Sequence, residues 1–527
     1  MQGLMGDQPL TVRTIFDRMR TVYGDNLVID ALVEGTTRTT YAALAERVLR
    51  LVTVLRDLGV QPGDRVASFA HNTSRHVELY FAVPLAGAVL HMVNIRLHDD
   101  QLEHVVADAG DSVLFVDDDL IPRLSSLRLP SVRTFVRLGK GDTSGIDEIL
   151  DAEGLLAVAV PAEELPELTE DMACGMCHTS GTTGMPKAVV YSHRSTYLHA
   201  MAACMVDALR LSEQERVLPV VPLFHACGWG LPYAAPLTGA ELVLVGSDTS
   251  PANLARVIAE EQVTWAAGVP TIWTGLLPLA GELTSLRTIG VGGSATPYAL
   301  LEAYDRLGIT ILQIWGMTET SPVAATSRPR RRHRGLGDEE LRQVRAKTGT
   351  IFAGLEARIV DDAGDPLPWD GEAVGELQCR GPWVATDYWG GAPEKFQDGW
   401  LRTGDMATME RDGYFRIVDR SKDLVKSGGE WISSVELEGA CLAHPAVQEA
   451  AVVGVRSVKW DERPVVVAAL VPGSTLTLAE LREFLLGRVA KWWLPEELVI
   501  VDEVAKTSVG KYDKKVLRAA LSDLVLP

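Results

Sequence analysis

The sequence has little positive charge. Its 50 lysine and arginine residues are outnumbered by 70 aspartate and glutamate residues, which leaves a formal net charge of −20 at pH 7. A chain with this balance lacks the basic surface that binds nucleic acid, so we expect no nucleic-acid partner. Any anionic ligand must therefore meet a local cluster of positive charge.

Export features and long apolar runs are also missing. The first ten residues contain no basic segment followed by an apolar one, so they do not resemble a signal peptide. The longest apolar stretch, 81–93, is interrupted by Pro84, Gly87 and His91 and falls short of the ~18 residues that a membrane span needs. We therefore expect a cytoplasmic protein with no membrane span, whose six cysteines are free thiols.

What the sequence does contain is a long series of alternating strand and helix patterns. Its 527 residues exceed what one core supports. Apolar spacing predicts a strand over 27–33 and helices over 41–58 and 196–209. The alternation predicts an α/β fold with largely parallel sheets, as two layered subdomains. Short strands from about residue 357 predict a small β-barrel, and a compact α+β series closes the chain.

These patterns predict two domains with a polar turn between them. The large N-terminal domain covers 1–419, the hinge covers 420–423, and the small mobile C-terminal domain covers 424–527. The last segment is domain-sized, which favours an independent core.

A loop rich in glycine and hydroxyl groups organises the chain. Residues 178–187, HTSGTTGMPK, lie between apolar runs that we expect to be strands. Glycine lets backbone N–H groups turn toward phosphate oxygens, and Lys187 adds a positive charge. Because Pro186 precedes the lysine and a strand follows, this is not the G-x-x-x-x-G-K-[ST] loop that opens a helix. The alternative interpretation is a flexible turn without a ligand.

Four further stretches contain groups suited to nucleotide chemistry. The stretch 292–295 has two glycines, beside which a flat ring can lie close to the backbone. The stretch 313–320 places a hydroxyl and a carboxylate at a strand end, the edge where open α/β sheets bind ligands. The stretch 400–405 supplies a carboxylate for ribose hydroxyls, and 506–511 supplies a lysine on a loop of the small domain. Each group also has a purely structural interpretation as a cap, a turn or a solvated charge.

The motifs TSGTTGMPK, WGMTET, LRTGD, GYFRIVDRSKDLVKSGGE and KTSVGK together resemble the adenylate-forming superfamily of acyl-CoA synthetases, peptide-synthetase adenylation domains and luciferases. The resemblance covers nearly the whole chain. The stretches FHACGWGLPYAAPLTGAELVL and KSGGEWISSVELE are most similar to those of medium- and long-chain fatty acyl-CoA ligases and of methylmercaptopropionate-CoA ligases.

This resemblance implies an ATP-dependent acid–thiol ligase with a small-molecule carboxylic acid as substrate. It would form an acyl-adenylate with release of pyrophosphate and pass the acyl group to coenzyme A with release of AMP. The implied acid is a medium- or long-chain fatty acid, the implied metal is Mg²⁺, and the implied assembly is a homodimer. The alternatives are an adenylating enzyme that loads a separate carrier protein, a methylmercaptopropionate-type short-chain ligase, a luciferase-like oxidase and a non-catalytic sensor.

The resemblance also implies roles for individual residues. The catalytic residues would be Lys511, Lys187, Glu319 and His225, and the Mg²⁺ ligands Glu319 and Thr179. The nucleotide would contact Thr179, Ser180, Gly181, Thr182, Thr183, Gly184, Gly293, Ser294, Ala295, Gln313, Ile314, Trp315, Gly316, Met317, Thr318, Asp405, Ile417 and Arg420. The acyl pocket would contain His225, Trp229, Gly268, Val269 and Pro270. Coenzyme A would contact Lys426, Ser427, Gly428, Gly429 and Glu430, and Lys422 would be the hinge.

The basic run 328–334 has two interpretations. It contains five arginines and a histidine, and it could attract the anionic tail of a nucleotide. Runs of this kind are more often solvated loops, which is the interpretation that we favour.

Overall fold

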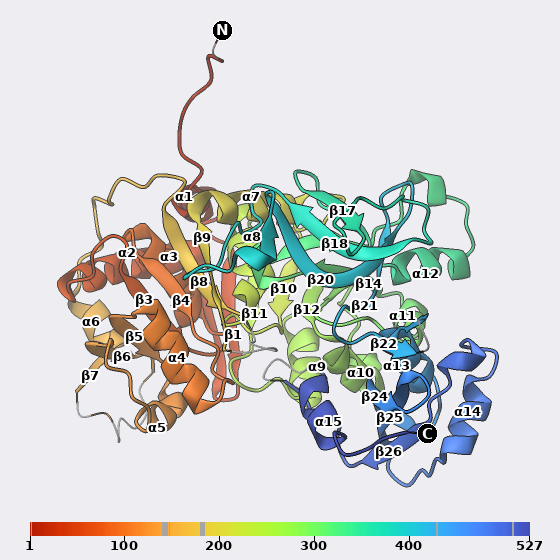
Figure 1. The fold of residues 1–527 in the computed structure, drawn as a ribbon. Helices are drawn as coiled ribbons and strands as arrows, with labels where there is room; N and C mark the ends of the chain where they lie inside the picture. Colours follow the sequence, from red (N-terminus) through yellow and green to blue (C-terminus); the bar gives the residue numbers. More distant parts are fainter. Residues whose placement is uncertain are drawn as a thin grey trace.

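The computed structural model describes residues 1, 3–139, 146, 148–179, 185–427, 430–507 and 511–526, and of Glu430 the backbone alone. A large lobe holds the N-terminal and central segments, and a smaller lobe holds the C-terminal segment, drawn in blue in Figure 1. No helix within these ranges has both the length and the apolar character that a membrane crossing needs.

One sheet of the large lobe is built mainly from the first strand–helix series. Its described strands pair in the order β7-β6-β5-β3-β4-β8-β9, and β9 alone among them runs antiparallel to its neighbour. The strands are β3 (Arg65–Phe69), β4 (Val89–Met92), β5 (Val113–Val116), β6 (Thr134–Arg137), β7 (Ile149–Asp151), β8 (Ala173–His178) and β9 (Ala188–Ser192). The helices of this series are α2 (Tyr41–Asp57), α3 (Ser74–Leu85), α4 (Asp99–Ala109), α5 (Ile121–Leu124), α6 (Ala152–Val158) and α7 (His193–Cys204).

The second sheet of the large lobe has the described order β16-β15-β14-β13-β12-β10-β11-β1-β2, parallel from β14 to β1. Its strands are β1 (Leu27–Leu32), β2 (Gly35–Thr40), β10 (Arg216–Pro219), β11 (Glu241–Leu244), β12 (Trp265–Gly268), β13 (Thr288–Val291), β14 (Thr310–Gly316), β15 (Val323–Thr326) and β16 (Thr350–Ile351). The helices of the corresponding segments are α1 (Val12–Val22), α8 (Leu231–Thr238), α9 (Pro251–Glu260), α10 (Pro270–Leu276), α11 (Tyr298–Arg306) and α12 (Asp338–Ala346). The predicted α/β fold with two layered, largely parallel sheets is confirmed.

The predicted strand over 27–33 is confirmed as β1, which joins the second sheet beside β11. The bounds of one predicted helix need correction. The predicted helix over 196–209 begins at His193 and ends at Cys204, because the Ser192 hydroxyl accepts a hydrogen bond from the Ser195 N–H and caps the helix earlier. The helix predicted over 41–58 is α2, in nearly the same place.

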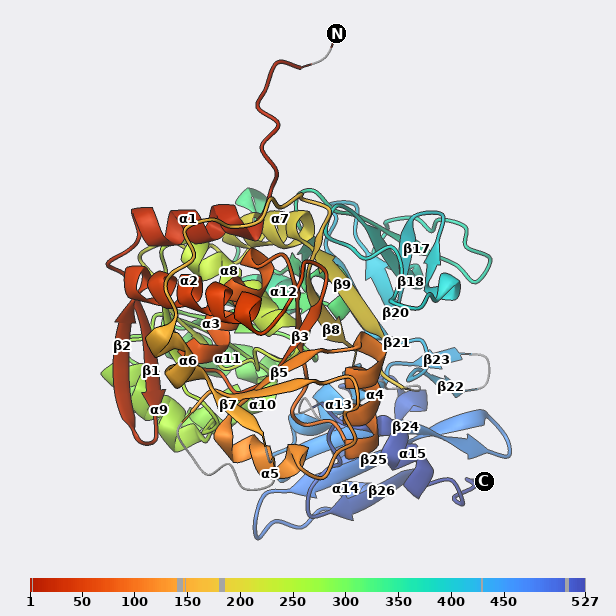
Figure 2. The same cartoon turned by 90° about the vertical axis from the view of Figure 1, so that its left-hand side faces the viewer.

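The predicted small β-barrel is an open antiparallel sheet among the described strands. Its order is β17-β18-β20-β19, with β21 also paired to β20, and these pairings close no ring. The strands are β17 (Glu356–Val360), β18 (Val374–Arg380), β19 (Phe396–Gln397), β20 (Trp400–Met409) and β21 (Phe415–Arg420). Figure 2 shows this sheet above the small lobe, with β21 toward the junction.

The small lobe has its own sheet and its own core. The described order is β23-β22-β25-β24, with β26 on β25. The strands are β22 (Val425–Ser427), β23 (Glu430–Ile432), β24 (Val447–Ser457), β25 (Asp461–Leu470) and β26 (Glu497–Val501), and the helices are α13 (Ser434–Leu442), α14 (Leu478–Leu485) and α15 (Lys514–Ala520). Its two apolar clusters contain no residue before Val425 among those described. A separate core is what a lobe needs to move as a unit.

Candidate active site

The nucleotide side of the candidate site lies at the carboxyl ends of neighbouring parallel strands. Gly292 and Gly293 follow β13, and β14 leads into the short helix η4 (Thr318–Thr320). A Cβ on Gly292 would come within 2.9 Å of the Ile314 carbonyl oxygen, and Gly293 has a φ of +85°, so both positions favour glycine. Residues 294–295 lie exposed beside them. The predicted adenine-binding stretch is therefore an accessible strand edge.

Asp405 is held between two side chains that the sequence assigned to the same nucleotide. The Trp315 indole N–H donates to Asp405 Oδ2 over 2.9 Å, and Arg420 Nε lies 2.7 Å from Asp405 Oδ1. Asp405 and Arg420 face each other in the register of β20 and β21, and the Trp315 ring packs edge-on against Phe415. The carboxylate is thus fixed in direction, and each of its oxygens keeps a further lone pair for a ribose hydroxyl.

Two buried polar oxygens at this strand edge are suited to contact a nucleotide base. Among the described side chains, Gln313 Oε1 and Thr296 Oγ1 are buried without a hydrogen-bond partner. Because buried polar atoms rarely lack partners, these two atoms fit a nucleotide base that would supply donors. The other predicted nucleotide contacts lie along the same strands: Ile314, Gly316, Met317 and Thr318 on β14 and just after it, and Ile417 on β21.

Glu319 is a buried carboxylate, held by a tyrosine that the sequence did not single out. The Tyr388 hydroxyl donates to Glu319 Oε1, and burial raises the pKa of Tyr388 so that this hydroxyl stays a donor. The ammonium of Lys187 lies 5.4 Å from the centre of the Tyr388 ring. Glu319 and Lys187 therefore meet at one aromatic ring. Lys187 belongs to the glycine-rich loop 178–187, called the phosphate loop below for its predicted role. A buried carboxylate with hydroxyls near it suits Mg²⁺, a hard cation that prefers oxygen ligands.

The base of the phosphate loop is tied by its own backbone. The Thr179 N–H donates to the Lys187 carbonyl over 2.9 Å, and the Lys187 N–H donates to Thr179 Oγ1 over 3.2 Å. Lys187 Nζ also lies 3.4 Å from Glu394 Oε1 in an exposed pair, which contributes little and is readily exchanged for phosphate. Ser180, Gly181, Thr182, Thr183 and Gly184 lie outside the described residues.

Lys511 reaches the large lobe from the small one. A Cβ built on Gly293 would come within 3.3 Å of Lys511 Cε, so the lysine stem lies against the nucleotide edge. Burial lowers the pKa of Lys511 to about 8; the Arg420 guanidinium adds to this shift, and the Asp405 and Glu319 carboxylates oppose it. The lysine ammonium therefore lies in the field of the same charged groups that surround the predicted nucleotide.

The predicted acyl residues border the same place. Trp229 packs on Gly292, whose missing Cβ would lie 2.9 Å from Trp229 Cη2, and Val269 Cγ1 would lie 3.4 Å from a Cβ on Gly293. Gly268 and Pro270 follow at the end of β12 and the start of α10. The structure thus brings the acyl residues and the nucleotide edge together.

His225 begins a strained turn beside these residues. Burial lowers the pKa of His225 to about 3, and the positive charges of Lys511 and Arg96 add to the effect, so the ring is neutral near pH 7. The backbone of the five residues 226–230 has φ between +37° and +75°. A left-handed turn of this kind costs about 1–2 kcal/mol for each residue other than glycine. Such strain is typical of segments shaped by a ligand site.

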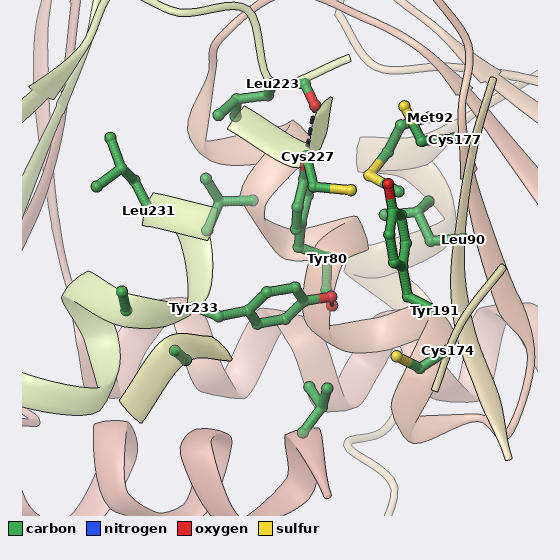
Figure 3. Packing of buried hydrophobic residues seen from close by; sticks show 14 of the residues in the cluster. Tyr80, Leu90, Met92, Cys174, Cys177, Tyr191, Leu223, Cys227, Leu231 and Tyr233 are labelled. Carbon is green, nitrogen blue, oxygen red and sulfur yellow. Dashed lines mark hydrogen bonds between the residues drawn. The ribbon is translucent and has the colours of Figure 1, made fainter. Parts of the chain in front are cut away.

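A small cavity lies behind this turn. Figure 3 shows Cys227, Tyr191, Tyr233 and Cys174 around it, from four different elements. Its volume is about 20 Å³, enough for one water molecule. The full lining is Met92, Cys174, Gly175, Tyr191, Thr196, His199, Cys227, Gly230, Tyr233 and Ser321. The sequence analysis missed this lining, because its residues come from segments that only packing brings together.

The predicted coenzyme A segment and hinge are only partly described. Ser427 is buried at the end of β22 and accepts a hydrogen bond from Arg463 Nη1 over 3.0 Å, whereas Lys426 is exposed. Gly428 and Gly429 lie outside the described residues, and Glu430 begins β23. The carbonyl of Lys422 accepts from Arg518 Nη2 over 3.1 Å, so the predicted hinge residue is tied to α15.

The basic run packs on the turn that joins β20 to β21. The guanidinium groups of Arg330 and Arg332 lie 5.2 and 5.9 Å from the centre of the Tyr414 ring. Arg330 Nη1 donates to the Asp412 carbonyl over 2.6 Å, and Arg328 donates to two backbone carbonyls after α7. These arginines have structural partners within the protein, and the interpretation of the run as a solvated loop stays a prediction.

Comparison with known proteins places the chain. Residues 20–389 match the family model "AMP-binding enzyme", and 436–511 match "AMP-binding enzyme C-terminal domain". The chain is 44% identical to a long-chain-fatty-acid–CoA ligase of Thermus thermophilus over 98% of its length and 96% of the relative. It is 41% identical to a 3-methylmercaptopropionyl-CoA ligase of Ruegeria lacuscaerulensis over 99% of both. The anthranilate CoA ligase AuaEII, solved with anthranoyl-AMP, superposes with a TM-score of 0.88 at 26% identity over 98% of each chain. The chain belongs to the AMP-binding enzyme family of adenylate-forming proteins.

Proposed function

We propose that this protein is an AMP-forming acyl-CoA ligase, which adenylates a carboxylic acid and then transfers the acyl group to coenzyme A. The observation that carries this proposal is the position of Lys511. It comes from the small lobe and lies against Gly293 of the large lobe, near Asp405, Glu319 and Arg420. A lysine in this position can contact both the carboxylate and the α-phosphate between which the new bond forms.

The first half-reaction needs charge neutralisation more than covalent help. A carboxylate attacks the α-phosphorus of ATP and pyrophosphate leaves, although both reactants are anions. Lys511 and Lys187 offset that repulsion from two sides. Glu319 would hold Mg²⁺, which supplies further positive charge for the leaving pyrophosphate. Holding the two reactants in line can contribute about 7–11 kcal/mol at best.

The second half-reaction requires the small lobe to move. With Lys511 at the nucleotide edge, the lysine occupies the path along which a thiol must approach the acyl-adenylate. Rotation of the small lobe about Lys422 would withdraw the lysine and bring the 426–430 segment to the adenylate. The thiol sulfur then attacks the acyl carbonyl and AMP leaves. The separate core of the small lobe supports such a motion.

Exposed indole rings near the 426–430 segment favour coenzyme A over a carrier protein as the acceptor. Lys426 Nζ lies 4.8 Å from the centre of the Trp431 ring, and Lys459 Nζ lies 4.7 Å from that of Trp460. Both rings are more than 40% exposed, and the pairing of Ser427 with Asp461 places the two hairpins side by side. Indole faces beside ammonium groups suit an adenine ring and its phosphates, in a chain whose overall charge is −20.

Pantetheine, which lacks the nucleotide of coenzyme A, tests this choice of acceptor. We expect Trp460→Ala to raise KM for coenzyme A several-fold and to leave KM for pantetheine unchanged. A carrier-loading enzyme would instead discriminate poorly between the two thiols and react best with a carrier protein.

The acid is proposed to have an uncharged, largely apolar tail. The cavity behind the His225 turn is lined by thiols and aromatic rings, which supports a medium- or long-chain fatty acid if the lining opens to admit it. The 41% identity to a 3-methylmercaptopropionyl-CoA ligase supports a second candidate, a short-chain acid of the methylmercaptopropionate type.

A panel of carboxylic acids of graded chain length, scored by AMP formation with and without coenzyme A, separates these candidates. A fatty acyl ligase gives rates that rise with chain length, whereas a short-chain ligase gives a maximum at a few carbons. An enzyme that releases pyrophosphate with every acid but never forms a thioester would contradict the proposed ligase function.

A further inference from the structure

Four buried or half-buried side chains form a continuous hydrogen-bonded chain beside the base of the phosphate loop. Asp111 Oδ2 lies 2.7 Å from His91 Nδ1, and His91 Nε2 lies 2.9 Å from His178 Nδ1. His178 Nε2 in turn lies 3.2 Å from Asp108 Oδ2. His91 and Asp111 are wholly buried, whereas Asp108 is one-third exposed at the surface end. The chain therefore runs from the interior to the surface of the large lobe.

The members of this chain depend on one another. Three hydrogen bonds between four groups require three protons, which is one more than two neutral imidazole rings carry. Burial raises the pKa of Asp111, so its carboxyl is the group suited to hold the third proton. Removal of any ring leaves a buried polar atom of its neighbour without a partner, which is costly inside a protein. The arrangement therefore fixes the orientation of both rings, and neither ring can turn alone.

His178 is the residue from which the phosphate loop departs. It ends β8 and pairs in register with Ala188, the first residue of β9. Thr179, which follows His178, and Lys187, which precedes Ala188, are joined by the pair of hydrogen bonds described above. The His178 ring is thus held one residue away from the base of the loop.

The surface end of the chain reaches the other side of the phosphate site. The Asp108 carbonyl accepts from the Trp389 indole N–H over 3.3 Å, and the Trp389 N–H donates to the Ala188 carbonyl over 2.9 Å. The preceding residue, Tyr388, donates to Glu319. One helix end, at Asp108, therefore contacts both the loop base and the segment that orients the predicted Mg²⁺ ligand.

We propose that Asp111, His91, His178 and Asp108 act together as positioning residues for ATP, by setting the base of the 178–187 loop relative to Tyr388 and Glu319. The inference rests on the proposed function, since it concerns the ATP-dependent half-reaction. None of the four side chains is a catalytic residue, because each acts through Thr179, Lys187 or Tyr388. The hydrogen bond between His91 and His178 connects the buried pair, Asp111 and His91, to the residue that precedes the loop.

The His91–His178 bond is tested by a double-mutant cycle. His91→Asn keeps an amide that can hydrogen-bond Asp111 but is too short to reach His178, and His178→Gln keeps a donor for Asp108 but not the bond to His91. We expect each variant to raise KM for ATP about tenfold in pyrophosphate exchange, with kcat and KM for the acid nearly unchanged. The double variant should raise KM for ATP no further, because both changes break the same bond.

His76 provides a matched control. It is another wholly buried histidine of the large lobe, with Ser68 Oγ 2.9 Å from its Nε2 and the His71 carbonyl 3.0 Å from its Nδ1. His76→Gln should lower Tm as much as His91→Asn does, and leave KM for ATP unchanged. A rise in KM for ATP in this control equal to that in His91→Asn would overturn the positioning role, since any buried histidine would then have the same effect.

Asp108→Ala keeps the test open if the interior variants fail to fold. This surface variant should raise KM for ATP about threefold and leave Tm nearly unchanged. An unchanged KM for ATP in folded His91→Asn or Asp108→Ala, or additive effects in the double variant, would overturn the proposal. If wild-type protein releases no pyrophosphate with any acid, the proposed function fails instead, and the dissociation constant of ATP measured by calorimetry then tests the positioning role through the same ratios.

Discussion

The two halves of the candidate site are stabilised by different physics. On the nucleotide side, charged and polar groups bond to one another, as in the contacts of Asp405 with Trp315 and Arg420 and of Glu319 with Tyr388. On the proposed acyl side, the contacts are van der Waals packing. The Trp229 ring lies on Gly292, and thiols and aromatic rings surround a cavity of about 20 Å³. The nucleotide side therefore depends on residue identity, and the acyl side on volume. Lys511 lies where the two halves meet.

Lys511→Ala is expected to have the largest effect, because it removes the group shared by both halves. Loss of one positioned charge at a transition state lowers a rate by about 10²–10³-fold, and pyrophosphate exchange should fall by at least that much. A supplied acyl-adenylate should still react with coenzyme A at nearly the wild-type rate. The check is to assay each half-reaction separately; an equal loss in both would show that the lysine does not act on adenylation alone.

Glu319→Gln should have the next largest effect and lower turnover about 10²-fold at low Mg²⁺. The amide keeps the volume and removes the charge, so the change isolates the metal role from packing. Titration of turnover with Mg²⁺ should show a higher half-saturating concentration. The metal assignment is wrong if that concentration stays at the wild-type value.

Tyr388→Phe should act through Glu319 and therefore act less strongly. It removes a hydrogen bond to a carboxylate, worth about 1.5–3 kcal/mol, and so should lower turnover about tenfold at limiting Mg²⁺. Excess Mg²⁺ should restore most of the activity, at a lower Mg²⁺ concentration than Glu319→Gln requires. An equal loss of turnover at limiting and at excess Mg²⁺ would show that Tyr388 does not act through the metal.

The pH dependence of adenylation should also report Lys511. Its folded-state pKa is about 8, so the ammonium is present below that pH and is lost as the pH rises through it. We expect kcat/KM for pyrophosphate exchange to fall above pH 8, by nearly tenfold for each further unit. Lys511→Arg, whose guanidinium stays charged, should flatten this limb, and a limb that persists in Lys511→Arg belongs to another group.

Cys174→Leu should have the smallest effect and change only the acyl side. The larger side chain fills the cavity, and a change of one methylene in such a pocket shifts preference by about 10-fold or more. The rate with the longest accepted acid should fall several-fold while KM for ATP stays constant. If KM for ATP changes with it, the two halves are not independent in the way that their contacts indicate.

Much of the fold followed from local patterns. The helix over 41–58 and the parallel α/β architecture formed as predicted, because apolar periodicity depends on neighbours in sequence. The sheet partner of β1 was not predicted, since pairing with β11 joins segments more than 200 residues apart. The start of α7 was also misplaced, because the Ser192 cap was overlooked.

For the site, the residue types could be predicted from the sequence, but the contacts between distant residues could not. Glycine at Gly293, the carboxylate of Asp405 and the lysine at Lys511 were predicted, because their chemistry is visible in single residues and short motifs. Tyr388 was missed, although a tyrosine is an ordinary hydroxyl donor, since its partner Glu319 is 69 positions away in the chain. The His91–His178 pair was missed for the same reason, as 87 positions separate the two rings.

The sequence by itself determined which chemical groups are available to this protein, because a glycine-rich loop with a lysine, a carboxylate at a strand end and a lysine near the C-terminus are each recognisable from residue type and local order. Only the tertiary structure decided which of those groups touch, what holds each in place, and how much room the acyl tail has. The reason is that distances between segments depend on how the sheets and lobes pack, and packing is a property of the whole chain.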